Sequence, residues 1–233
     1  MYVRKCACSL RWPAIMQREV LLRKVKSIMS NGTNTSFGLL KQIDAGVLNV
    51  GYAETGPTDG RTVILLHGWP YDIHSYVDVA PLLAKAGYRV IVPYLRGYGT
   101  TRFLSSDTFR NGQQSVVALD IIALMDALKI ERAIIAGFDW GARTADIIAA
   151  LWPERCEAIV SVSGYLIGSQ ESGKVPLPPK AELEWWYQYY FATERGRAGY
   201  EQYRHDFGSL VFSGVQNYCI ISYLCQQIDV PTS

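Results

Sequence analysis

The feature that most constrains the fold of this chain is an alternation of short β-rich runs with helix-like stretches. Four runs made mostly of Val, Ile, Leu and Ala lie at residues 63–66, 89–92, 133–136 and 158–162. Three stretches with helical spacing of apolar side chains separate them, at residues 76–86, 113–128 and 141–152. Short apolar runs of this kind are typical of strands buried on both faces. The alternation therefore predicts an α/β fold, a mostly parallel sheet with helices on both faces.

Two further β-rich runs, at residues 39–43 and 47–53, come without a helix between them. The connecting residues Asp44, Ala45 and Gly46 have the chemistry of a turn. A short turn between two β-rich runs is typical of an antiparallel hairpin, and we expect this hairpin at the edge of the sheet.

The size and composition of the chain indicate one main globular domain. With 233 residues, 49% of them hydrophobic and 19% charged, the chain can bury one substantial core. After Gly164 the sequence becomes rich in Gly and Pro, and an aromatic, helix-like stretch then follows at residues 181–207. This change indicates a linker into a small helical cap. We expect four segments: a basic N-terminal extension over residues 1–36, an α/β core over 37–165, a partial cap over 166–207 and a divergent tail over 208–233.

Charge and cysteine usage exclude several classes of function. Residues 1–31 hold seven Lys or Arg and one Glu, so the rest of the chain carries a net charge of −4 against +2 for the whole. A mildly acidic body is not expected to bind nucleic acid. The five cysteines have neither a CxxC pattern nor paired zinc spacing. We therefore expect no disulfide framework, no metal and no cofactor.

Cysteine usage also bears on location, because unpaired cysteines fit a reducing compartment. A cytoplasmic location is expected, although the basic, acid-poor N-terminus has a weak likeness to a transit peptide. The apolar runs fall short of the roughly 20 residues that cross a bilayer, so no membrane span is expected. The oligomeric state is left open.

The strongest chemical signal is Gly137-Phe138-Asp139-Trp140-Gly141, which joins a predicted strand to a predicted helix. A strand, a tight turn and a helix are the context of a nucleophile elbow, in which small flanking residues allow the sharp turn. Asp139 would then project above the carboxyl ends of the strands. A carboxylate is already ionised at neutral pH, which favours attack on a saturated carbon. The alternative is that Asp139 caps the helix that follows it.

A second motif, His67-Gly68-Trp69-Pro70, directly follows the strand predicted at residues 63–66. A turn here can direct the backbone N–H of Trp69 toward the nucleophile, and with the N–H of Trp140 it would form an oxyanion hole. His67 is expected to be a hydrogen-bonded turn residue and not a base. A third motif, Arg96-Gly97-Tyr98-Gly99, predicts a glycine-rich turn without a catalytic role of its own.

These motifs resemble those of the epoxide hydrolase branch of the α/β-hydrolase superfamily, to which haloalkane and haloacid dehalogenases also belong. The resemblance spans about residues 37–207 and rests on HGWP, RGYG, GFDWGA and the aromatic segment at residues 186–191. It implies an α/β-hydrolase fold and a small-molecule substrate, an epoxide or a halogenated compound. Asp139 would open the ring and form an alkyl-enzyme ester, and the amides of Trp69 and Trp140 would stabilise the oxyanion that forms when water cleaves the ester.

The resemblance also implies roles for side chains around the nucleophile. Tyr187 matches a cap tyrosine that hydrogen-bonds the epoxide oxygen, and the alternative for it is packing within the cap. Tyr189 and Tyr190 are further candidates for substrate binding. Arg143 resembles the arginine that binds the haloacid carboxylate in fluoroacetate dehalogenases, whose pattern has another arginine where this chain has Trp140. A haloalkane or haloacid dehalogenase is therefore an alternative, as is a surface position for Arg143.

The chain departs from the family pattern after the cap. Ester hydrolysis requires a histidine base, and in the family this histidine follows the nucleophile and an acid in the chain. His67 and His74 precede Asp139, and His205 lies in the cap-like stretch. Residues 208–233 do not resemble the family, so we expect a C-terminally truncated chain with the last strands missing. A non-catalytic chain that binds a ligand or partner is the second hypothesis, and an esterase is disfavoured because no G-x-S-x-G occurs.

Overall fold

A computed structural model describes residues 36–164 and 170–215 of the chain. The described residues form one seven-stranded sheet with the order β1-β2-β4-β3-β6-β7, and β5 pairs with β2 outside this path. The strands are β1 (Lys41–Ala45), β2 (Leu48–Thr55), β3 (Thr62–Leu66), β4 (Arg89–Pro93), β5 (Arg102–Phe103), β6 (Ala133–Phe138) and β7 (Cys156–Val162). Pairing is parallel from β4 through β3 and β6 to β7, and antiparallel where β1 meets β2 and β2 meets β4 or β5. The predicted mostly parallel sheet with an edge hairpin is confirmed.

The hairpin turn is shorter than the sequence indicated. Ala45 pairs with Leu48 in the ladder, so the connection consists of Gly46 and Val47. The φ of Gly46 is +58°, a conformation that glycine adopts without a steric cost, and this places the turn one residue later than predicted. The short strand β5 was not predicted, because its pairing with β2 depends on a distant part of the chain.

Helices cover both faces of the sheet, as predicted. The helices before the predicted cap are η1 (Ile73–Tyr76), α2 (Val79–Lys85), α3 (Gln114–Ala127), α4 (Trp140–Leu151) and η2 (Pro153–Arg155). On one face, Leu66 and Ile135 pack with Ile121 of α3 and Ile148 of α4 in the larger core cluster. On the other face, a second cluster joins strand residues to η1 and α2. None of the helices that the structure describes is long and apolar enough to cross a membrane.

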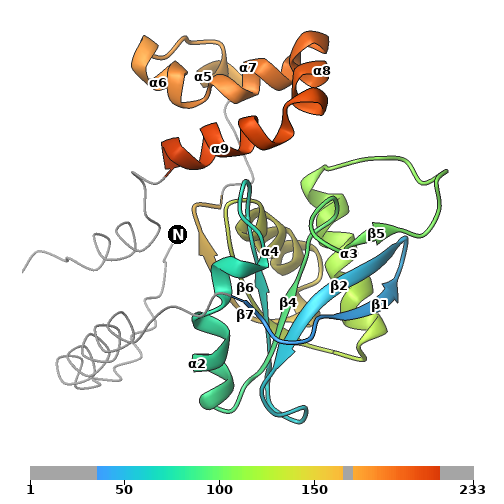
Figure 1. Ribbon diagram of the computed structural model, residues 1–233. Coiled ribbons are helices and arrows are strands. Elements are labelled where there is room, and N and C mark those ends of the chain that lie inside the picture. The colour runs from blue at the N-terminus through green and yellow to red at the C-terminus, as the bar shows by residue number, and fades with distance from the viewer. Residues whose placement is uncertain (1–35, 165–169, 216–233) are drawn as a thin grey trace, which may run out of the picture.

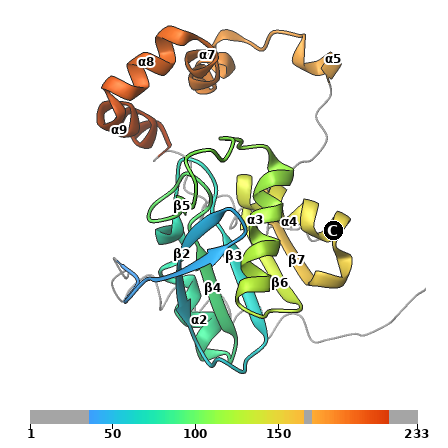
Figure 2. The same ribbon diagram turned by 90° about the vertical axis from the view of Figure 1, so that its right-hand side faces the viewer.

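A group of short helices follows the sheet and stands apart from the layers that cover its faces (Figures 1 and 2). These are α5 (Gln170–Gly173), α6 (Pro179–Glu184), α7 (Trp186–Ala192), α8 (Glu194–Gln202) and α9 (Arg204–Val215). Aromatic rings hold α7, α8 and α9 together; the cluster contains Trp186, Tyr190, Phe191, Tyr200 and Phe207. The predicted boundary between residues 207 and 208 falls inside α9. Residues 1–35, most of the predicted extension, and residues 216–233 of the predicted tail lie outside the described residues.

The burial predicted for residues 158–162 is wrong. These residues form most of β7, in which Ile159 is 40% exposed and Val160 53% exposed. Within the described part of the chain, β7 is hydrogen-bonded only to β6 and ends the sheet. The composition of this strand is that of a central strand, but its neighbours place it at an edge.

Candidate active site

The turn between β6 and α4 places Asp139 at a sharp corner. Asp139 has φ +51° and ψ −115°, a conformation that is strained for a residue with a side chain. The glycines two residues before and after it allow other backbone segments to lie close to this corner. A Cβ on Gly137 would lie 2.4 Å from the carbonyl carbon of Gly141, and one on Gly141 would lie 2.0 Å from the carbonyl oxygen of Leu66. The corner therefore requires glycine on both sides of the aspartate.

Backbone hydrogen bonds hold this strained corner in place. The N–H of Asp139 donates to the carbonyl of Val162 in β7 at 3.0 Å, and the N–H of Arg143 donates to the carbonyl of Asp139 at 3.0 Å. The first bond ties the corner to the neighbouring strand, and the second is a turn of α4. Both polar groups of the Asp139 backbone are thus satisfied, which offsets part of the conformational cost.

The carboxylate of Asp139 points to the turn after β3. Its Oδ1 accepts a hydrogen bond from the N–H of Trp69 at 2.9 Å, and its side chain is 32% exposed. The side chain makes no capping hydrogen bond to α4, although Asp139 occupies the N-cap position. The helix-capping alternative is therefore wrong. The carboxylate is instead held by one main-chain donor of the HGWP turn and remains accessible.

The fully buried side chain of His67 holds the HGWP turn in place. Its Nε2 accepts from the N–H of Leu95 at 3.2 Å, so its Nδ1 carries the proton and donates to the carbonyl of Gly68 at 3.2 Å. Burial lowers the pKa of His67 and keeps the ring neutral. The prediction of a hydrogen-bonded turn residue is confirmed.

Arg143 lies one helical turn after the nucleophile candidate and is mostly buried, so the surface alternative is wrong. Its Nη2 is 3.6 Å from Oδ2 of Asp139, and 14% of its side chain is exposed. The guanidinium lies over the ring of Trp140, 5.0 Å from the ring centroid. The positive group is therefore oriented by an aromatic face and directed to the second carboxylate oxygen.

The cap brings one of the three predicted tyrosines to this site. The ring of Tyr187 lies 4.5 Å from that of Trp69, whose amide binds Asp139. Tyr189 is 60% exposed and its hydroxyl donates to Glu182 at 2.5 Å, within the cap. Tyr190 stacks on Phe207 inside the aromatic cluster of the cap. The structure thus joins Tyr187 to Trp69, Asp139, Trp140 and Arg143, and gives Tyr189 and Tyr190 partners within the cap.

Comparison with known proteins agrees with this geometry. The family model described as the alpha/beta hydrolase fold matches residues 61–200, which is more than half of the chain. The chain belongs to the α/β-hydrolase fold family. The matched region contains β3 to β7, the corner at Asp139 and most of the cap helices. The predicted fold class is confirmed.

Several relatives of this α/β-hydrolase are named as epoxide hydrolases. The chain is 32% identical to epoxide hydrolase B of Mycobacterium tuberculosis over 150 residues, 59% of this chain and 41% of that one. It is 37% identical to epoxide hydrolase 3 of Siraitia grosvenorii over 108 residues, 46% of this chain and 34% of that one. A crystal structure of a candidate epoxide hydrolase from Klebsiella pneumoniae is 68% identical, with a TM-score of 0.69, over 74% of this chain and 57% of that one. The chain thus spans less than two thirds of the length of each of these relatives.

Tyr98 of this α/β-hydrolase lies near the site, although only a glycine-rich turn was predicted for its motif, RGYG. Its ring meets that of His67 edge to face, with centroids 4.6 Å apart. Burial and then the charge of Asp139 raise the pKa of the Tyr98 phenol, which therefore stays protonated. The available signal was its place after β4, because β4 pairs with β3 and the ends of both strands meet at one edge.

The three histidines of the α/β-hydrolase have other partners than Asp139. His67 holds the turn after β3, and His74 pairs with Asp72 at 2.9 Å. The side chain of His205 is 97% exposed, with Asp206 at 3.9 Å. These contacts assign none of the three histidines to the carboxylate.

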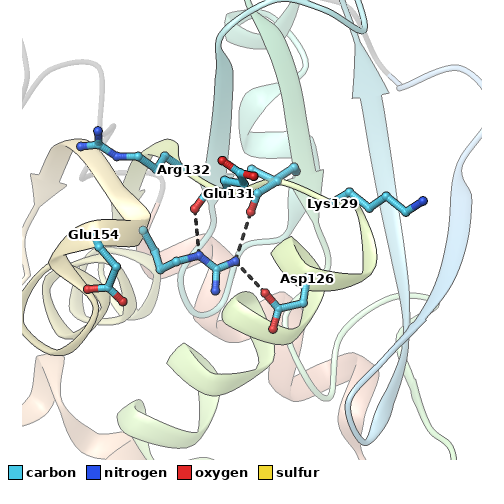
Figure 3. A pocket seen from close by; sticks show the side chains of 7 residues that line it. Asp126, Lys129, Glu131, Arg132 and Glu154 are labelled. Atoms are coloured by element: carbon cyan, nitrogen blue, oxygen red, sulfur yellow. Dashed lines mark hydrogen bonds and ion pairs between the residues drawn. The ribbon is translucent and has the colours of Figure 1, made fainter.

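Asp139 lines neither of two surface hollows of the α/β-hydrolase. One, of about 570 Å³ (Figure 3), is lined by Asp126, by residues 129–132 before β6 and by residues 154–155 before β7. Asp139 follows β6 at the other end of that strand. Arg155 crosses it and donates to Asp126 at 2.7 Å and to the carbonyl of Glu131 at 2.8 Å. The other, of about 430 Å³, lies between the start of α3 and Trp140. Among the described side chains, no cluster of His, Cys, Asp and Glu is placed to hold a metal.

Proposed function

We propose that this chain acts on epoxides through the carboxylate of Asp139, which attacks a ring carbon and forms an alkyl-enzyme ester. The observation that carries the proposal is the position of Asp139 at the strained corner, with Oδ1 bound to the Trp69 amide and the side chain accessible. The epoxide hydrolase relatives support the choice of substrate class. An ionised carboxylate needs no base for this first step.

The first step uses the two carboxylate oxygens differently. Oδ1 stays on the Trp69 amide and becomes the carbonyl oxygen of the ester, while Oδ2 forms the new bond to carbon. The ring C–O bond breaks, and its electron pair leaves as an alkoxide on the former ring oxygen. A phenol is a suitable proton donor to this alkoxide, and Tyr187 is our candidate because its ring lies against Trp69. Tyr189 and Tyr190 remain proposed substrate contacts.

The second step is hydrolysis of the ester. Water adds to the carbonyl carbon, and negative charge builds on Oδ1, where the amides of Trp69 and Trp140 would stabilise it. The bond between the acyl carbon and Oδ2 then breaks, and Oδ2 leaves with the substrate carbon and takes up the proton removed from water. The products are the diol and the carboxylate of Asp139, which keeps the oxygen of the water. This step needs a base to take a proton from water, and the contacts of the three histidines supply none at the site. We therefore expect the alkyl-enzyme to accumulate in this chain.

Intact-mass analysis after exposure to an epoxide tests the proposal. The wild-type chain is expected to gain the mass of one epoxide without sustained turnover, and Asp139→Ala is expected to gain none. Asp107→Ala is the matched control, because Asp107 is an exposed carboxylate that contacts Ser106. Unchanged labelling in Asp139→Ala would refute the assignment of the nucleophile.

The remaining outcomes separate the alternatives. A chain that only binds a ligand or partner shows no adduct with any epoxide. Sustained diol formation would show that a base acts on the ester, and His205→Ala would then test the exposed cap histidine. A haloalkane or haloacid dehalogenase would form the ester from a halogenated compound with release of halide, but not from the epoxide.

A further inference from the structure

Tyr98 is a second phenol beside the proposed nucleophile, and it comes from the core of the fold and not from the predicted cap. It lies in the turn after β4, where Gly97 and Gly99 on either side of it have φ +84° and +48°. Its ring meets that of His67 edge to face, with centroids 4.6 Å apart. This contact with a fully buried ring holds the phenol at the edge of the sheet where β3 and β4 end.

The turn that His67 holds is the turn that contacts Asp139. The Nδ1 of His67 donates to the carbonyl of Gly68 at 3.2 Å, and a Cβ on Gly68 would lie 2.7 Å from Oδ1 of Asp139. After burial, the charge of Asp139 and then Tyr200 of α8 raise the pKa of the Tyr98 phenol. The hydroxyl of Tyr98 therefore stays protonated and lies within electrostatic reach of both the carboxylate and the predicted cap.

The hydroxyl of Tyr98 is a donor to which the described residues supply no partner. Within residues 36–164 and 170–215 no hydrogen bond to this hydroxyl is formed, whereas the hydroxyl of Tyr76 donates to the carbonyl of Leu66 at 2.9 Å. The side chain of Tyr98 is half-buried. A ligand that covers such a donor without offering an acceptor loses binding free energy, so the donor discriminates between ligands with and without an acceptor.

The ring oxygen of the epoxide already has a donor in the proposed function. Tyr187 lies against Trp69, with ring centroids 4.5 Å apart, whereas Tyr98 lies against His67 and belongs to a different loop. Two phenols that reach the surroundings of Asp139 from different elements can contact different atoms of one substrate. If Tyr187 protonates the ring oxygen, Tyr98 is left for a substituent of the epoxide.

We infer that Tyr98 selects epoxides that carry an acceptor oxygen on the carbon next to the ring, a hydroxyl or an ether, and that its hydroxyl donates a hydrogen bond to this oxygen. The inference rests on the proposed function and names its substrate class. Oδ2 of Asp139 forms the bond to a ring carbon, and the ring C–O bond breaks toward its oxygen, which takes up the proton of Tyr187. Tyr98 keeps its own proton throughout this step.

The test compares two pairs of neutral epoxides as reagents for Asp139. Glycidol is paired with ethyloxirane, and methyl glycidyl ether is paired with propyloxirane, so that within each pair an oxygen replaces one carbon. Each labelling rate is measured by intact mass and divided by the rate of the same epoxide with acetate, which removes differences in intrinsic reactivity. The wild-type chain is expected to favour the oxygen-containing member of each pair about 5-fold, a ratio typical of one neutral hydrogen bond.

Tyr98→Phe keeps the ring against His67 and removes only the hydroxyl. It is expected to slow labelling by the two oxygen-containing epoxides more than labelling by the other two, so that each preference falls to about one. Tyr88→Phe is the matched control and is expected to keep the wild-type preferences, because Tyr88 directly precedes β4 and lies at the opposite end of that strand from Tyr98.

The wild-type comparison decides the inference even if Tyr98→Phe does not fold. An ether oxygen accepts a hydrogen bond but cannot donate one, so equal normalised rates within either pair overturn the assignment of Tyr98 as a donor to the substrate. A preference that a folded Tyr98→Phe retains, or an equal fall of all its rates, also overturns the inference and leaves Asp139 as the nucleophile. Absence of labelling by every epoxide overturns the proposed function itself.

Discussion

The position of Asp139 depends on the glycines two residues before and after it and on a third glycine that lies against its side chain. Gly137 and Gly141 allow the corner, and Gly68 allows the HGWP turn to pass close to the carboxylate. A Cβ on Gly68 would lie 2.6 Å from Cβ of Asp139 and 2.7 Å from its Oδ1. The position of the proposed nucleophile therefore depends on a residue that has no side chain.

Gly68→Ala is expected to displace the carboxylate and to slow its labelling by an epoxide about 100-fold, as misplacement of a reacting group by about 1 Å can do. The labelling rate measured by intact mass checks this. Gly112→Ala is the control, because a Cβ on Gly112 meets nothing within 4 Å. Labelling of Gly68→Ala at the wild-type rate would contradict the close contact.

His67 gives stability a pH dependence. Burial lowers its pKa in the folded chain below the value of about 6.5 in the unfolded chain, so the unfolded state binds the proton more readily. The contribution of the neutral His67 ring to the free energy of unfolding is complete above pH ~6.5. It is lost as the pH falls from there through the folded-state pKa. Histidine ordinarily titrates between about pH 5 and 8. Over this range, urea unfolding should show a steeper loss of stability with falling pH in wild type than in His67→Gln. Parallel curves for the two chains would show that His67 does not contribute in this way.

At the scale of elements, the loop after β4 is tied to α3 by a buried ion pair. Arg96 donates to both carboxylate oxygens of Asp120 at 2.6 Å and to the carbonyl of Asn111 at 2.6 Å. The side chains of Arg96 and Asp120 are 7% and 9% exposed. The pair fixes the turn that carries Tyr98. The position of this loop near the site therefore depends on a contact between residues that are far apart in the sequence.

Removing one partner leaves the other charge buried and unsatisfied, so Asp120→Ala is expected to lower the free energy of unfolding by about 3–5 kcal/mol. The double variant Arg96→Met/Asp120→Leu is expected to lose less, because it removes both charges. Urea titration of the three chains measures this. The exposed pair of Lys174 with Glu171 provides the control, and Lys174→Ala should change little. A loss in Asp120→Ala no larger than in Lys174→Ala would count against a buried pair.

The features of the site that could be predicted from the sequence are those that depend on residues close together along one element. The G-x-D-x-G pattern located Asp139, and the resemblance to fluoroacetate dehalogenases pointed to Arg143. The turn of the hairpin was misplaced, because either Ala45 or Gly46 could have ended β1, and the ladder to Leu48 decides between them. The contact of Tyr98 with His67 was not predicted, because it depends on the pairing of β4 with β3, which the local sequence does not encode.

At the scale of the whole molecule, the part of the sheet that the structure describes ends on a strand with the composition of a core strand. Ile159 and Val160 of β7 are exposed, and the same strand holds the corner at Asp139 through the carbonyl of Val162. Burial could not be predicted from the strand itself, because it depends on which elements lie next to it. The strand that ends the described part of the sheet thus also supports the proposed nucleophile.

An exposed apolar edge strand is a surface on which other chains can pair. Val160→Lys is therefore expected to reduce concentration-dependent self-association of the purified chain, measured by light scattering. Leu119→Lys is the matched control, because Leu119 is 51% exposed but lies on helix α3 and offers no strand edge. Equal reduction by both changes would indicate general surface charge and not the edge of β7.

The most direct test of the account is the site of the epoxide adduct within the chain. Trypsin releases residues 133–143 as one peptide, in which Asp139 is the only carboxylate side chain and no Cys, His or Lys occurs. Tandem mass spectrometry of this peptide, after exposure of the folded chain to an epoxide, is expected to place the whole added mass on Asp139. An unmodified 133–143 peptide, with the added mass on Cys156 or another residue, would contradict the assignment of Asp139 as the nucleophile.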